Sequence, residues 1–170
     1  MAVKTTTDST FNQIARKGSK LNQFVAQSKK LIGDEVATRT LTAAESGALC
    51  LFDTAAGVTY TLPTIDRTEQ IGMFFDFFPN VSGTGTYKVI TGASTEFLLG
   101  ALAMFDVTIA TSGDIFTANG TTIVSVAMTS DQEGRLLGGK FRVTAISLTQ
   151  WAIEGYLRGA GTLADPFATS

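Results

Sequence analysis

The chain of 170 residues contains no histidine, and this absence excludes several kinds of catalytic site. Without an imidazole there is no Ser-His or Cys-His nucleophile pair, no histidine general base and no histidine-ligated metal site. One cysteine, Cys50, is too few for an internal disulfide or a cysteine-based metal cluster. Because Cys50 lies within an apolar run, we expect a small buried side chain and not a reactive thiol.

Charged residues and long apolar runs are also scarce. Charged side chains make up 16% of the chain, against about a quarter in an average globular domain. With 12 Phe and 17 Gly, this composition suggests a β-rich protein whose surface is largely covered, for example by copies of itself. The alternative is a well-packed monomer with Thr and Ser on its solvent-facing sides.

No apolar run approaches the roughly 20 residues of a membrane-spanning helix. The first ten residues also lack the apolar core of a secretory signal. We therefore expect a protein that is made in a cytosol, stays soluble there and binds no membrane.

The charges that are present are unevenly divided along the chain. Residues 1–33 carry six basic side chains and one acidic side chain, whereas residues 34–170 carry seven basic and 14 acidic side chains. A basic segment joined to an acidic body indicates a partner with negative charge.

The basic segment has a helical pattern from Phe11 to Ile32, after Ser9 or Thr10 as an N-cap. Apolar residues recur at heptad-like spacing, although Gly18 weakens the helix by about 1 kcal/mol relative to alanine. One interpretation is an amphipathic helix that packs on its own β domain. The other is an arm that docks on a second protein or on its own copies. In that case the binding residues are Phe11, Ile14, Arg16, Lys17, Lys20, Leu21, Val25, Lys29 and Lys30.

After Gly33 the pattern changes to a period of two, which marks the clearest domain boundary. We predict an N-terminal arm at residues 1–33, a connector at 34–38, a β domain at 39–158 and a C-terminal tail at 159–170. Short strands separated by turn residues predict a mainly β fold, an antiparallel β-sandwich or barrel-like domain with an N-terminal helical arm.

Two segments predict β-hairpins. Within Leu41–Pro63, the apolar run Ala48–Phe52 and the alternating run Val58–Leu62 flank a turn that contains Gly57. Asn119 and Gly120 form a strong two-residue turn signal between Ile115–Ala118 and Thr121–Met128.

No residue cluster predicts catalysis. The glycines at 83, 85, 138 and 139 lack the spacing of a phosphate-binding loop, and we expect no cofactor and no metal. Asp76 lies in the apolar strand Ile71–Phe78, where burial would require a partner such as an arginine. We favour a solvent-facing or subunit-facing Asp76, and a core position for Trp151. One arginine in the basic segment is too few for nucleic-acid recognition, so we expect no nucleic-acid partner.

Several of these segments together resemble a β-module of tailed-bacteriophage virion proteins, above all head decoration (cement) proteins and head or tail fibres. The resemblance covers about residues 40–158 and excludes residues 1–33. Its motifs are Leu41–Gly47, Leu51–Gly57, Val58–Pro63, Gly72 with the aromatic strand after it, Tyr87–Thr91 and Gln150–Gly155. It implies a structural protein, often a homotrimer, and carries no catalytic residues.

Our first hypothesis is a decoration protein that binds the major capsid protein on the outside of the virion, after assembly in the host cytoplasm. A fibre or knob that binds a host receptor or glycan is the alternative. The long loops 64–70, 80–86 and 129–139 contain neither Trp nor Tyr, which argues against that alternative. An enzyme is the least favoured class, because a β-helix depolymerase requires a repeat that the sequence does not show.

Overall fold

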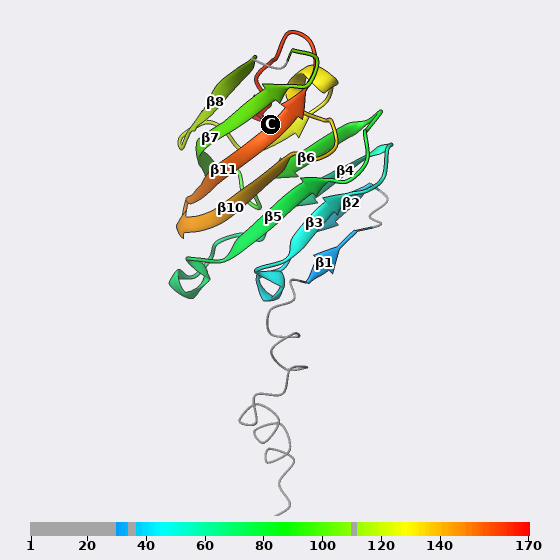
Figure 1. Ribbon diagram of the computed structural model, residues 1–170. Coiled ribbons are helices and arrows are strands. Elements are labelled where there is room, and N and C mark those ends of the chain that lie inside the picture. The colour runs from blue at the N-terminus through cyan, green and yellow to red at the C-terminus, as the bar shows by residue number, and fades with distance from the viewer. Residues whose placement is uncertain (1–29, 34–36, 110–111) are drawn as a thin grey trace, which may run out of the picture.

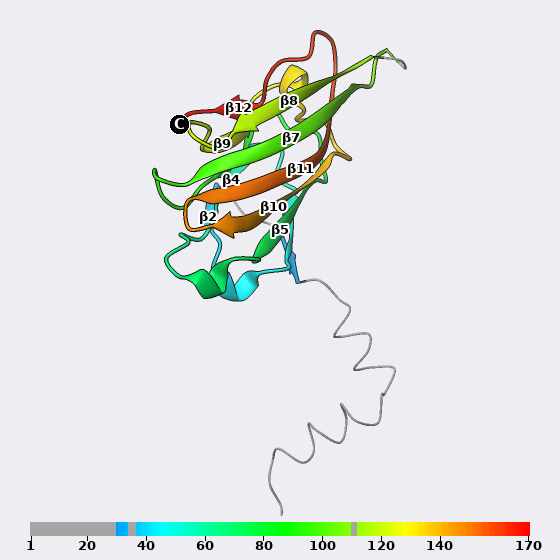
Figure 2. The same ribbon diagram turned by 90° about the vertical axis from the view of Figure 1, so that its left-hand side faces the viewer.

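The computed structural model describes residues 30–33, 37–109 and 112–170. This part of the chain is mainly β, as predicted, and its strands form two sheets that pack against each other (Figures 1 and 2). Sheet A has seven strands, in the order β1 (Leu31–Ile32), β3 (Leu49–Phe52), β5 (Phe74–Pro79), β10 (Lys140–Ser147), β11 (Gln150–Gly159), β7 (Phe97–Asp106) and β8 (Gly113–Asn119). Sheet B has five, in the order β12 (Phe167–Ala168), β9 (Ser125–Met128), β6 (Thr86–Ile90), β4 (Gly57–Thr61) and β2 (Thr38–Thr40). The described helices are short 3-10 turns, η1 (Ala43–Glu45), η2 (Thr68–Gln70) and η3 (Asp131–Glu133).

The first six strands alternate between the two sheets. β1, β3 and β5 pair in parallel in sheet A, and β2, β4 and β6 pair in parallel in sheet B. The chain therefore winds as stacked coils of unequal length. The prediction of an antiparallel domain is wrong for this half of the fold. The connections between these strands differ in length, so the strands do not recur at a fixed spacing in the sequence.

The predicted hairpin at Leu41–Pro63 is also wrong. Its two strands, β3 and β4, lie in different sheets, and the turn between them carries the chain across the core. Their inward faces meet there, with the rings of Phe52 and Tyr60 5.4 Å apart. A period of two shows that one face of a strand is buried, but it does not show which strand pairs with it. A hairpin within one sheet and two strands in facing sheets both fit the same alternation.

The second half of the chain is largely antiparallel. β10 pairs antiparallel with β5 and β11, β7 with β8, and β9 with β6 and β12, whereas β11 and β7 are parallel. The predicted hairpin at Asn119-Gly120 is wrong, because β8 and β9 belong to different sheets. These residues do turn the chain. The Asn119 Oδ1 atom accepts backbone N–H groups of Thr121 and Thr122, each at 3.0 Å.

Both ends of the described chain belong to the β domain. Leu31 and Ile32 were predicted to be helical, but they form β1 beside Leu49 and Cys50, because buried Ile32 completes the edge of the core. Cys50 is buried and free, as expected. In the predicted tail, β12 pairs with β9. The predicted helical arm upstream of Lys30 lies outside the described residues.

Candidate interaction surface

The outer face of sheet A carries exposed apolar side chains along β7, β8 and β11. Because side chains alternate across a strand, the buried residues of these strands point toward sheet B and their neighbours point outward. Leu99, Phe105, Ile115 and Tyr156 are 39%, 54%, 73% and 40% exposed. We call these four residues the outer strip. Sheets of soluble monomers normally place polar side chains on such a face, so this surface suits a protein contact.

The strands bring the outer strip together from distant parts of the sequence. Ala103 lies opposite Ile115 on one side and beside Tyr156 on the other. The rings of Phe105 and Tyr156 are 6.1 Å apart. This surface was not among the sites predicted from the sequence. A signal was present in the sequence of β7, where odd and even positions are both mainly apolar. That pattern predicts a strand with two apolar faces.

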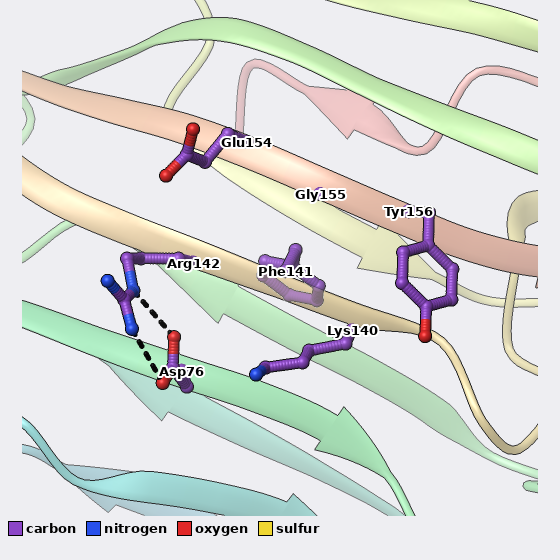
Figure 3. A pocket seen from close by; sticks show the side chains of 7 residues that line it. All are labelled: Asp76, Lys140, Phe141, Arg142, Glu154, Gly155 and Tyr156. Carbon is purple, nitrogen blue, oxygen red and sulfur yellow. Dashed lines mark hydrogen bonds and ion pairs between the residues drawn. The ribbon is translucent and has the colours of Figure 1, made fainter.

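A pocket of about 300 Å³ on β5, β10 and β11, lined by charged and aromatic side chains, shares Tyr156 with the outer strip (Figure 3). The Arg142 guanidinium donates to both Asp76 carboxylate oxygens, at 2.7 and 3.0 Å. It also lies 4.3 Å from the centre of the Phe74 ring, within cation–π distance. Glu154 and Tyr156 line the pocket from β11.

The structure corrects one part of our interpretation of Asp76. The residue lies on the outer face of sheet A, opposite the core residues Phe75 and Phe77, as favoured. Its side chain is nevertheless only 1% exposed, because it is paired with Arg142 within the chain. The two residues are paired in the register of β5 and β10. Sequence reasoning identified arginine as a suitable partner for a buried Asp76, but it could not identify which one, because their strands are distant in sequence.

A second polar cluster fixes the N-terminal end of the described chain. One oxygen of the Glu45 carboxylate accepts hydrogen bonds from Lys30 Nζ at 2.6 Å and from Arg39 Nη2 at 2.7 Å. The other oxygen accepts hydrogen bonds from the Thr42 backbone N–H and hydroxyl group. Burial alone would raise the Glu45 pKa, but these hydrogen bonds together lower it from 4.5 to about 2.

Lys30 is the one predicted binding residue within the described chain, and this cluster holds it against the β domain. The other eight, Phe11, Ile14, Arg16, Lys17, Lys20, Leu21, Val25 and Lys29, lie outside the described residues. Their role remains a prediction.

Replacing Glu45 with glutamine is expected to lower the free energy of unfolding at pH 7 by about 2 kcal/mol, because hydrogen bonds to charged groups are lost. In the parent chain, the folded-state pKa lies below the unfolded value near 4.5. The carboxylate's contribution is therefore complete above that pH and decreases as the pH falls toward 2. Urea unfolding at several pH values measures both effects. A constant difference between parent and variant from pH 7 to pH 3 would contradict this account.

The described residues include no group of three or more His, Cys, Asp or Glu side chains that could hold a metal ion. Among these residues, no helix has the length and apolar character needed to cross a membrane. Comparisons with protein-family models, curated proteins and solved structures found no match. The surfaces and polar clusters of the β domain are therefore the basis for the proposed function.

Proposed function

We propose that this chain is a structural protein of a tailed-phage virion that binds the outside of the capsid as a decoration protein and stabilises it. The observation that carries the proposal is where the basic segment joins the fold. Lys30 and β1 are held at one edge of sheet A, by Glu45 and by pairing with β3. Residues 1–29 are thus attached at the edge farthest in strand order from β8 and the outer strip.

This placement separates contacts with the capsid, made by the basic segment, from contacts between neighbouring copies, made by the β domain. Residues 1–33 have a net positive charge and an apolar heptad-like pattern, which suit an acidic, partly apolar surface on the major capsid protein. The β domain then projects outward. A capsid presents many equivalent sites, so modest affinity at each one suffices once neighbouring copies also contact each other. The sequence resemblance to phage decoration and fibre modules supports the same role.

Deleting residues 1–29 is expected to abolish binding to purified capsids in a co-sedimentation assay. The deletion stops before Lys30, because Lys30 and β1 contribute to the described fold. Near-ultraviolet circular dichroism checks that the β domain is retained. Binding of the full chain is expected to weaken as salt is added, because charge contacts at a surface are screened. Unchanged binding after the deletion, with the fold intact, would contradict attachment through this segment.

A fibre or knob that binds a host glycan is the second candidate, and the pocket on β5, β10 and β11 favours it. The pocket combines Arg142 and Glu154 with the half-exposed ring of Tyr156, a combination suited to sugar hydroxyls and a ring face. A glycan array provides the test. This candidate requires a reproducible hit that Tyr156→Ala removes and that Leu137→Ala, at an exposed site outside the pocket, retains. An array without hits argues against it.

A further inference from the structure

We infer that the outer strip binds the same face of a second copy of this chain. This inference goes beyond the virion role and rests on the surface alone. The two-sheet core leaves Leu99, Phe105, Ile115 and Tyr156 exposed although they are large and apolar. Contiguous apolar side chains of this size mark interaction sites on soluble proteins.

The shape of the face is suited to packing against its own copy. Ala101 and Ala103 separate Leu99 from Phe105 along β7, so small side chains lie between larger ones. At one end of the strip, a groove of about 500 Å³ runs along Ala103, Phe105, Gly113 and Ile115. Two such faces related by a two-fold axis can place the large side chains of one copy over the small ones of the other.

The area of the outer face approaches that of a specific protein–protein contact. The outer face includes the five neighbouring strands β5, β10, β11, β7 and β8. These strands contain six to ten residues each. With a rise of about 3.3 Å per residue and strands about 4.8 Å apart, the face measures roughly 650 Å². A stable protein–protein contact buries about 800 Å² on each partner. The face therefore approaches the size that a specific dimer needs, before any contribution from the β8 edge.

The charges beside the strip favour a second copy over a partner of one charge sign. Lys140 and Arg158 are basic and Glu154 is acidic, and all three project from β10 and β11 toward the outer face. When two copies are related by a two-fold axis, the basic side chains of each copy can lie near the acidic side chain of the other. A strongly acidic or basic partner would leave one sign unpaired.

The neighbouring edge strand also lacks features that prevent association. β8 is the last strand of sheet A and contains no proline or lysine, and Asp114 is its one charged residue. Natural edge strands commonly carry such residues to prevent contact with other chains. Within the described structure, β8 therefore carries few of the residues that would prevent a second copy from docking on the neighbouring face.

Light scattering of the full chain tests this inference. We expect a mass twice that of the monomer, and we expect Ile115→Lys to raise the dissociation constant at least 100-fold. Leu137→Lys is the matched control, because Leu137 is 48% exposed but lies outside the strip. This control is expected to retain the parent mass. A monomeric parent chain, or an Ile115→Lys variant that still associates like the parent, overturns the inference.

Thiol labelling gives a second readout that does not depend on disrupting the contact. Cys50 is buried, so a cysteine introduced at residue 115 is the accessible thiol among the described residues. We expect maleimide to label Ile115→Cys at least 10-fold more slowly in the associated state than after dilution. Leu137→Cys is expected to react at one rate throughout. Equal, concentration-independent rates at both positions overturn the inference. Loss of capsid binding in the deletion variant has no bearing on either result.

Discussion

Replacing Arg142 with methionine is expected to lower the free energy of unfolding by about 3 kcal/mol, the lower end of the cost of breaking a buried ion pair. The variant leaves the Asp76 carboxylate, 1% exposed, without the guanidinium that donates to both of its oxygens. The Arg142 side chain is 37% exposed, so water can partly replace it, and this places the effect at the lower end. Urea unfolding monitored by Trp151 fluorescence measures the change.

The matched control is the double variant Asp76→Leu/Arg142→Met, which removes both charges from the same position. Replacing a buried pair with apolar residues of similar volume is often neutral or stabilising. We therefore expect the double variant to recover most of the stability lost in the single variant. If Arg142→Met costs less than about 0.5 kcal/mol, or if the two substitutions are simply additive, Asp76 does not depend on this partner.

Replacing Trp151 with alanine is expected to cost about 4 kcal/mol, the range observed when a large buried aromatic side chain is removed. Trp151 is fully buried, and its ring lies 6.4 Å from that of Phe75. Its Nε1 atom donates a hydrogen bond to one oxygen of the buried Glu96 carboxylate at 3.0 Å. The other Glu96 oxygen accepts a hydrogen bond from the Ile65 backbone N–H at 2.7 Å. For a chain of this size the loss corresponds to a fall in Tm of roughly 10 °C.

Trp151→Phe separates the two contributions, because it keeps an aromatic ring and removes the indole N–H donor. We expect it to cost about 1–2 kcal/mol, the cost of an unsatisfied buried acceptor. Thermal unfolding by differential scanning calorimetry compares the variants. Equal losses in Trp151→Ala and Trp151→Phe would show that the hydrogen bond to Glu96 outweighs packing, and would contradict the larger contribution that we assign to packing.

The sequence predicted the buried faces of strands better than their partners. The alternation in Val58–Leu62 and Tyr87–Thr91 correctly indicated strands with one buried face, and Trp151 is in the core as predicted. Strand pairing depends on contacts between distant segments, and alternation contains no information about them. For this reason β3 and β4 were interpreted as a hairpin, and β2 to β6 were assigned to an antiparallel domain. Asn119-Gly120 fitted a hairpin turn for the same reason, since a turn does not specify the sheet of the next strand.

The candidate surfaces were predictable to different degrees. The charge division at Gly33 is a property of the sequence and led directly to the basic segment. The outer strip combines residues of β7, β8 and β11, so it exists only once those strands lie side by side. The pairs Asp76–Arg142 and Lys30–Glu45 likewise join residues far apart in the chain. Low charge content indicated a covered surface, but it did not indicate which strands form that surface.

The most direct test of the proposed function is whether the chain co-purifies with assembled phage particles, and in what ratio to the major capsid protein. Quantitative mass spectrometry of particles purified on a density gradient gives that ratio. We predict that the chain remains with intact, DNA-filled particles at a fixed ratio set by the repeating sites of the capsid. Its absence from purified particles, or a ratio that varies with the amount of free protein and falls to zero on washing, would contradict the account.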